Sequence, residues 1–146
     1  MSAKDVASVV AMERKSSKYP WSKSNLSRSI ESGDNCQIVC WHSKEVGYYI
    51  LQHSVGVTEI LNLVVFQDYQ EMGVGKQLLA LIFSDAVRNQ SREVWLEVRQ
   101  GNEIARKLYK SAGFYEQGVR KGYYLTDFER CPSAKEDAIL MACSIK

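Results

Sequence analysis

A turn with two glycines, between an apolar segment and an amphipathic one, is the part of this sequence best suited to bind an anion. Gly73 and Gly75 follow the apolar segment Val57–Phe66 and precede LLALIFSDAV, whose apolar residues recur at helical spacing. The start of a helix exposes unpaired backbone N–H groups and the positive end of the helix dipole, so phosphate oxygens bind there. Glycines would let such a ligand contact the main chain. A turn without any ligand is the alternative.

The residues around these glycines exclude two common nucleotide-binding loops. The triphosphate-binding loop requires glycine at position 70 and serine or threonine at position 77, where this chain has Gln70 and Gln77. The dinucleotide fingerprint G-x-G-x-x-G requires a third glycine where Leu78 stands. The turn is therefore expected to hold a phosphate-bearing ligand of another class.

Glu97 is a candidate for acid–base chemistry. The apolar alternation of Glu93–Val98 predicts a strand with the Glu97 side chain in the middle of the sheet. A carboxylate in that position is costly to desolvate unless it is paired or used in a reaction. An edge position facing water, or a salt bridge with Arg99 or Arg106, is the alternative explanation.

Tyr109 is a second polar candidate. It shares one face of a predicted helix with Ala105, Leu108 and Ala112, and this face is expected to pack on the sheet. Core packing is the default role of such a tyrosine. A buried phenol needs a hydrogen-bond partner, however, and a ligand atom could be that partner.

The rest of the sequence predicts the elements that position these residues. Helices are expected at Val6–Lys15, at Ser22–Ile30 with Ser22 as N-cap, and at Asn102–Ala112 with Asn102 as N-cap and Gly113 as its C-terminal stop. Strands are expected at Gln37–His42, Val46–His53, Val57–Phe66, Glu93–Val98 and Asp137–Ile145, with another beginning at Phe114–Tyr115. A polar loop is expected at Thr126–Lys135. The order predicts a mixed α/β fold around one central sheet.

Composition limits the possible partners. A chain of 146 residues that is 45% hydrophobic is expected to form one domain, residues 1–146. A net charge of +2, from 19 basic and 17 acidic residues, disfavours nucleic acid or an anionic membrane as partner. No apolar run approaches about 20 residues and no leader is evident, which predicts a soluble cytoplasmic protein. The spacing of the cysteines and histidines fits no zinc-binding pattern, so no metal site is expected. These residues are Cys36, Cys40, Cys131, Cys143, His42 and His53.

Taken together, these features resemble the ribosomal-protein-alanine N-acetyltransferases, the RimI-like branch of the Gcn5-related N-acetyltransferase (GNAT) family. The resemblance covers nearly the whole chain. Its landmarks, in order, are Pro20-Trp21-Ser22, Leu61–Val65, Gln70–Lys76, Trp95–Arg99, Asn102 with Ala105 and Tyr109, Gly113-Phe114, Arg120-x-x-Tyr123-Tyr124 and Glu136–Ala138. It implies a single-domain GNAT fold, with a central mixed, mostly antiparallel sheet flanked by helices on both faces.

The resemblance also implies an activity and roles for individual residues. Acetyl-CoA would be the cosubstrate, and the acetyl group would pass directly to the α-amine of an N-terminal alanine, without a metal or a covalent enzyme intermediate. Glu97 would accept a proton and Tyr109 would donate one. The implied cofactor-binding residues are Leu63, Val64 and Val65 for pantetheine, Glu71, Met72, Gly73, Val74, Gly75 and Lys76 for pyrophosphate, and Asn102. The implied acceptor-binding residues are Arg120, Tyr123 and Tyr124.

The acceptor is less well defined than the cofactor. A protein N-terminus, in particular that of a ribosomal protein, is expected because the landmarks at Arg120–Tyr124 and Glu136–Ala138 lie beyond the common cofactor-binding core. Acetylation of a small amine or a lysine is one alternative, and a non-catalytic acyl-CoA-binding module is another. Glu71 stands where many relatives carry arginine, so a lower cofactor affinity is expected. A monomer or weak dimer is expected.

Overall fold

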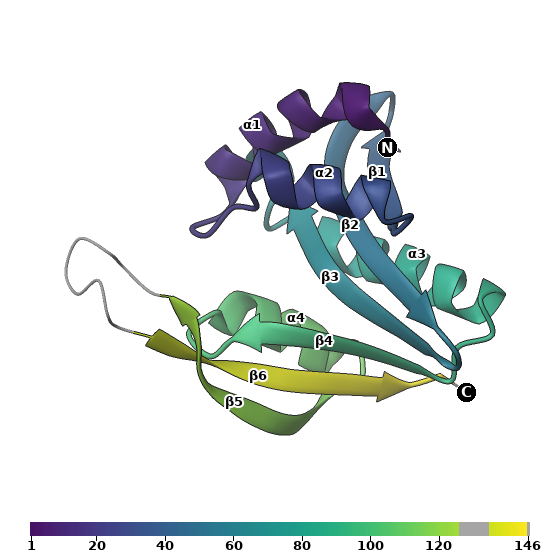
Figure 1. Ribbon diagram of the computed structural model, residues 1–146, viewed down its shortest axis with the longest axis vertical. Coiled ribbons are helices and arrows are strands. Elements are labelled where there is room, and N and C mark those ends of the chain that lie inside the picture. Colours follow the sequence, from purple (N-terminus) through teal and green to yellow (C-terminus); the bar gives the residue numbers. More distant parts are fainter. Residues whose placement is uncertain (126–134, 146) are drawn as a thin grey trace.

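A six-stranded mixed sheet with helices on both faces makes up the computed structural model, which describes residues 1–125 and 135–145 (Figure 1). None of the described helices is long and apolar enough to cross a membrane. The helices are α1 (Val6–Ser16), α2 (Lys23–Glu31), α3 (Val74–Arg88) and α4 (Glu103–Ser111), with short 3₁₀ segments η1 (Ala3–Asp5) and η2 (Gln67–Tyr69). The strands are β1 (Asn35–Trp41), β2 (Lys44–Ser54), β3 (Val57–Val65), β4 (Glu93–Arg99), β5 (Tyr115–Leu125) and β6 (Lys135–Ser144).

The two central strands of the sheet separate partway along their length. The strand order is β1-β2-β3-β4-β6-β5, and only β3 and β4 are parallel to each other. Their pairing covers only Val57–Ile60 with Glu93–Leu96. Beyond this point β3 continues to pair with β2, and β4 continues to pair with β6, so the strands diverge (Figure 1). The expected mixed, mostly antiparallel sheet is confirmed, and β3 has one open edge.

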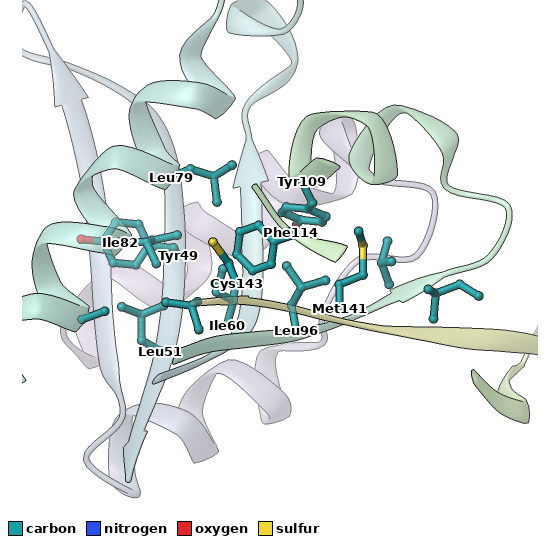
Figure 2. Close-up of a cluster of buried hydrophobic side chains, with 14 residues drawn as sticks. Tyr49, Leu51, Ile60, Leu79, Ile82, Leu96, Tyr109, Phe114, Met141 and Cys143 are labelled. Carbon is teal, nitrogen blue, oxygen red and sulfur yellow. The ribbon is translucent and has the colours of Figure 1, made fainter. Parts of the chain in front are cut away.

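Alternating side chains of β2 supply the cores on both faces of the sheet. Tyr49 and Leu51 belong to a cluster that includes residues of α3 and α4, and Figure 2 shows how side chains from these helices and the strands meet there. Tyr48 and Ile50 point to the other face, into a cluster with residues of α1 and α2. This period of two along the strand is what a sheet covered on both faces requires.

A β-bulge in β3 changes which face its side chains cover. Ile50 of β2 pairs with Asn62, but the next residue, Leu51, pairs with Ile60, which leaves Leu61 as an extra residue in β3. Ile60 therefore packs in the cluster under α3, whereas Val64, an even number of residues later, packs under α1 and α2. A bulge produces this reversal because it shifts the alternation by one residue. The bulge lies where β3 leaves β4.

Several local predictions from the sequence are confirmed and one is wrong. The Ser22 hydroxyl accepts a hydrogen bond from the Asn25 N–H at 3.1 Å, so Ser22 is the N-cap of α2 as predicted. The prediction that the first strand includes His42 is wrong, because β1 ends at Trp41. His42 and Ser43 have φ angles of 50° and 66°, which make them the two central residues of the hairpin turn instead. The predicted loop Thr126–Lys135 lies outside the described residues except for Lys135, which begins β6.

Loss of the α2 cap should destabilise the protein measurably. Ser22→Ala removes the acceptor of the Asn25 N–H, and we expect the free energy of unfolding to fall by about 1 kcal/mol in urea titrations. Ser24→Ala is the matched control, since the Ser24 hydroxyl is exposed and makes no hydrogen bond with any described residue. The control should change stability by less than about 0.5 kcal/mol. An equal loss in both variants would contradict the capping role.

Candidate active site

The first turn of α3 has N–H groups without a hydrogen-bond partner among the described residues. Gly73 precedes the helix with a left-handed φ of 79°, and no side chain in the described part of the chain caps the helix. The N–H groups of Val74, Gly75 and Lys76 donate to no residue that the structure describes. A Cβ on Gly73 would meet nothing within 4 Å, whereas a Cβ on Gly75 would lie 2.9 Å from Cδ2 of Leu108 in α4. Gly73 thus leaves room above the turn, and Gly75 allows α4 to approach α3.

The charges around this turn oppose one another. Glu71, Met72 and Lys76 are all exposed, and Glu71 has a positive φ of 61°. The Lys76 ammonium and the helix dipole favour an anion, while the Glu71 carboxylate disfavours one. The predicted pyrophosphate-binding residues are therefore brought together at one helix start, with one opposing charge among them.

The open edge of β3 presents main-chain groups toward β4. The Phe66 N–H donates to the Val46 oxygen of β2 at 2.9 Å. Because main-chain groups alternate along an antiparallel ladder, those of Val64 also point to β2, and those of Leu63 and Val65 point to the open edge. A ligand with amide groups could pair there as an added strand does. Of the three residues predicted to bind pantetheine, Leu63 and Val65 have main-chain groups at the edge, and Val64 lies between them.

Side chains cover part of this open edge. The Asn62 Oδ1 accepts the Leu63 N–H at 3.1 Å, and the Gln70 Nε2 donates to the Val65 oxygen at 3.0 Å. Main-chain groups without a strand partner need such contacts or water. A ligand that offers its own donors and acceptors could replace these two contacts, so the edge fits an extended ligand with amide groups.

Glu97 lies on the face of β4 opposite α4. Its neighbours along the strand, Leu96 and Val98, are buried in the cluster that includes α4, as the predicted alternation requires. The Glu97 carboxylate pairs with the Arg120 guanidinium of β5, with Oε1 and Nε 3.1 Å apart. The Glu97 side chain is 15% exposed and that of Arg120 is 56% exposed. Arg99 and Arg106, the partners considered from the sequence, pair with other carboxylates.

A second carboxylate stands near Glu97. Glu59 of β3 lies opposite Trp95, two residues before Glu97 along β4. Burial, followed by the negative charge of Glu97, raises the pKa of Glu59, while Arg120 opposes the shift. Two carboxylates with one guanidinium favour the approach of a cation. Glu59 was not among the site residues predicted from the sequence, although its position beside the apolar Ile60 in an alternating strand is a signal.

Tyr109 is buried beneath the sheet, as predicted. Its side chain is 8% exposed and packs edge-on against Phe114, with ring centroids 5.6 Å apart (Figure 2). Its hydroxyl makes no hydrogen bond with a described residue. Burial raises the pKa of Tyr109, and the nearby Tyr124 raises it further. Burial and then the Glu97 charge raise the pKa of Tyr124 to about 12. Tyr124 is therefore near both Glu97 and Tyr109.

Arg99 joins the α1–α2 connection to the end of the sheet beside Glu97. Its guanidinium carbon lies 3.5 Å from the centroid of the Tyr19 ring and 4.4 Å from that of Tyr124, and its Nη1 lies 3.2 Å from a Glu136 oxygen. Stacking of this kind stabilises a partly desolvated arginine. The contact fixes Tyr124 and brings the segment before α2 close to the predicted acceptor residues. Tyr19 was not among the predicted site residues.

The other predicted residues lie around the same region. The Tyr123 and Tyr124 rings are 5.0 Å apart, and the Arg120 guanidinium lies 5.3 Å from the Tyr123 ring. The three predicted acceptor residues thus lie together on β5, whose Arg120 also forms the ion pair with Glu97. Asn102 caps α4 by accepting the Ala105 N–H at 3.2 Å, which confirms the capping prediction. Within the described ranges, no three His, Cys, Asp or Glu side chains gather as a metal site would require.

Comparison with known proteins agrees with this geometry. A family model described as the acetyltransferase (GNAT) family matches residues 7–114. The [ribosomal protein bS18]-alanine N-acetyltransferase of Escherichia coli (strain K12) is 32% identical over 142 residues, which are 97% of this chain and 92% of that protein. The protein of the same description from Salmonella typhimurium is 30% identical over 146 residues, 99% of this chain and 95% of the relative.

Solved structures share the fold. The crystal structure of the ribosomal-protein-S18-alanine N-acetyltransferase from Escherichia coli superimposes with a TM-score of 0.87 and 28% identity, over 100% of this chain and 91% of that one. A GNAT family acetyltransferase from Elizabethkingia anophelis, crystallised with acetyl-CoA bound, gives a TM-score of 0.72 at 21% identity, over 85% of this chain and 84% of that one. The second likeness bears on the fold alone.

Proposed function

Because this chain belongs to the acetyltransferase (GNAT) family, we propose that it transfers the acetyl group of acetyl-CoA to the α-amine of a protein N-terminus. The acceptor that we propose is an N-terminal alanine of a ribosomal protein. The relatives described as acting on such a substrate match almost the full length of this chain, which supports this acceptor over a small amine.

One observation carries the proposal: β3 parts from β4 between the open turn of α3 and the Glu97 carboxylate. The N–H groups at the start of α3 fit a diphosphate, and the edge groups of Leu63 and Val65 fit the amides of a pantetheine arm. Membership of the acetyltransferase (GNAT) family supports this ligand. Acetyl-CoA supplies an activated acetyl thioester, and the chain supplies the groups around it.

Glu97 is the proposed proton acceptor for the attacking amine. An α-amine has a pKa of about 8, so about a tenth to a fifth of it is uncharged near neutral pH, and it becomes strongly acidic once it attacks. The Glu97 carboxylate already binds a cation, Arg120, whose side chain is 56% exposed. An arriving ammonium group can replace this guanidinium, which then turns into solvent. The carboxylate is thus placed both to attract the amine and to take its proton.

Tyr109 is the proposed proton donor to the leaving thiolate. Burial raises the pKa of Tyr109, which keeps the phenol protonated at neutral pH. From ordinary pKa values near 8.5 for a thiol and 10 for tyrosine, the transfer is uphill by about 2 kcal/mol. The raised pKa of Tyr109 increases this difference, although the same surroundings also raise the pKa of a buried thiol. The Tyr109 hydroxyl makes no hydrogen bond with a described residue, so it can donate to the ligand.

A substrate panel tests the proposed acceptor. We expect release of free thiol from acetyl-CoA with peptides that begin with alanine, and none with the same peptides blocked at the α-amine, because only the free amine can attack. Internal lysines and spermidine should react at most slowly. Thiol release followed by mass spectrometry of the peptide measures this. Preference for spermidine or lysine would contradict the acceptor, and cofactor binding without turnover on any amine would contradict catalysis.

Substitution of the two proposed catalytic residues should slow turnover without loss of folding. We expect Glu97→Gln and Tyr109→Phe each to lower kcat about a hundredfold, because each removes one proton transfer. Affinity for acetyl-CoA, measured by calorimetry, should stay within about threefold of wild type, a change of roughly 0.6 kcal/mol. Tyr115→Phe, at an exposed tyrosine of β5, is the control and should leave kcat unchanged. Unfolding of either variant, or unchanged kcat in both, would indicate that Glu97 and Tyr109 have a purely structural role and would contradict the proposed proton transfers.

A further inference from the structure

α1 carries a buried carboxylate, Glu13, that the proposed chemistry does not use. Glu13 is 1% exposed, and three donors converge on it. The Tyr48 hydroxyl of β2 donates to Oε2, the Trp21 N–H donates to Oε1 at 3.1 Å, and the Asn62 Nδ2 of β3 donates to Oε1 at 3.2 Å. The Asn62 Nδ2 also lies 2.7 Å from the Tyr48 oxygen. Each member of this network therefore holds another in place.

The network ends at the open edge of β3. Asn62 is the residue that follows the bulge at Leu61, and its Oδ1 accepts the Leu63 N–H. Its amide is therefore fixed on one side by Glu13 and Tyr48 and on the other by the main chain of the edge. A bulge leaves a strand locally short of ladder hydrogen bonds, so an outside contact is needed to set its geometry.

The same helix also holds the far end of this edge. The Ser16 hydroxyl at the end of α1 accepts the Gln67 N–H at 2.9 Å, and the Gln70 Nε2 bridges the Ser16 and Val65 oxygens at 3.1 and 3.0 Å. Contacts from α1 thus meet β3 on both sides of Leu63 and Val65. A buried ionic network is rarely the most stabilising solution for a core, because an apolar residue of similar volume often serves as well.

We propose that Glu13 is a positioning residue for the cosubstrate: through Tyr48 and Asn62 it fixes the bulge of β3 so that Leu63 and Val65 present their main-chain groups to the pantetheine arm. This inference rests on the proposed function, since it concerns the same edge. In the protein without ligand, the Asn62 Oδ1 accepts the hydrogen bond of the Leu63 N–H. The network holds the Asn62 side chain and the edge of β3 in one conformation until the ligand binds.

The chain contains a matched second network for comparison. Tyr49, the next residue of β2, points to the opposite face and donates to the buried Asp85 carboxylate of α3 at 2.6 Å. Tyr48→Phe and Tyr49→Phe therefore each remove one buried tyrosine–carboxylate hydrogen bond from the same strand. Only the first bond belongs to the network that reaches the edge of β3.

Calorimetric titration of both variants with acetyl-CoA separates positioning from simple stability. We expect Tyr48→Phe to raise the Kd for acetyl-CoA about tenfold, which corresponds to about 1.4 kcal/mol, and Tyr49→Phe to leave it within about twofold. The urea midpoints of the two variants should fall by similar amounts. Glu13→Gln and Asp85→Asn form a second pair with the same expectation. The fragment 3′-phospho-ADP, which lacks the pantetheine arm, should bind wild type and Tyr48→Phe equally.

Each other outcome overturns the inference. Unchanged or tighter binding of acetyl-CoA by Tyr48→Phe, or equal weakening in Tyr49→Phe, would assign Glu13 to stability alone. Equal weakening of the 3′-phospho-ADP fragment would locate the effect away from the β3 edge. Failure of the wild-type protein to bind acetyl-CoA would contradict the proposed function, and this inference with it. The wild-type titration detects that failure before any variant is measured.

Discussion

The separation of β3 from β4 beyond Ile60 and Leu96 is the constraint on which the rest of this structure depends. A strand that loses one neighbour exposes main-chain donors and acceptors, and these must be satisfied by side chains, water or a ligand. Here two amide side chains, Asn62 and Gln70, cover part of the edge of β3. The edge is thus preserved in the middle of the sheet, where an added strand or an extended ligand can pair with it.

Diverging strands also require contacts that hold the two halves of the sheet at a fixed angle. At one end, β3 and β4 pair directly. At the other end, the Arg99 guanidinium lies between the rings of Tyr19 and Tyr124, and so joins the α1–α2 connection to β4 and β5. The cation–π contacts and the buried network of Glu13 both originate from the same layer of helices. The helices α1 and α2 therefore support the separation as well as covering a core.

Local sequence patterns predicted the elements well, and the residues of the site in part. Most element boundaries lie within two residues of those expected, because the apolar periodicities and caps such as Ser22 and Asn102 act locally. The exception is α3, which begins at Val74, ahead of the apolar run LLALIFSDAV that predicted it. The bulge at Leu61 had no signal in the sequence, since β3 contains no glycine. The Glu97–Arg120 ion pair was also missed. It depends on β6 lying between β4 and β5, a strand order that no local pattern encodes.

Amide hydrogen exchange, followed by NMR with and without coenzyme A, tests the central claim most directly. If the separated strand receives the cosubstrate, exchange at Leu63 and Val65 and in the first turn of α3 should slow by at least about tenfold on saturation. Exchange at Val64, whose main chain already faces β2, should change much less. Unchanged exchange at Leu63 and Val65 under saturating coenzyme A, or slowing confined to other parts of the protein, would contradict the account.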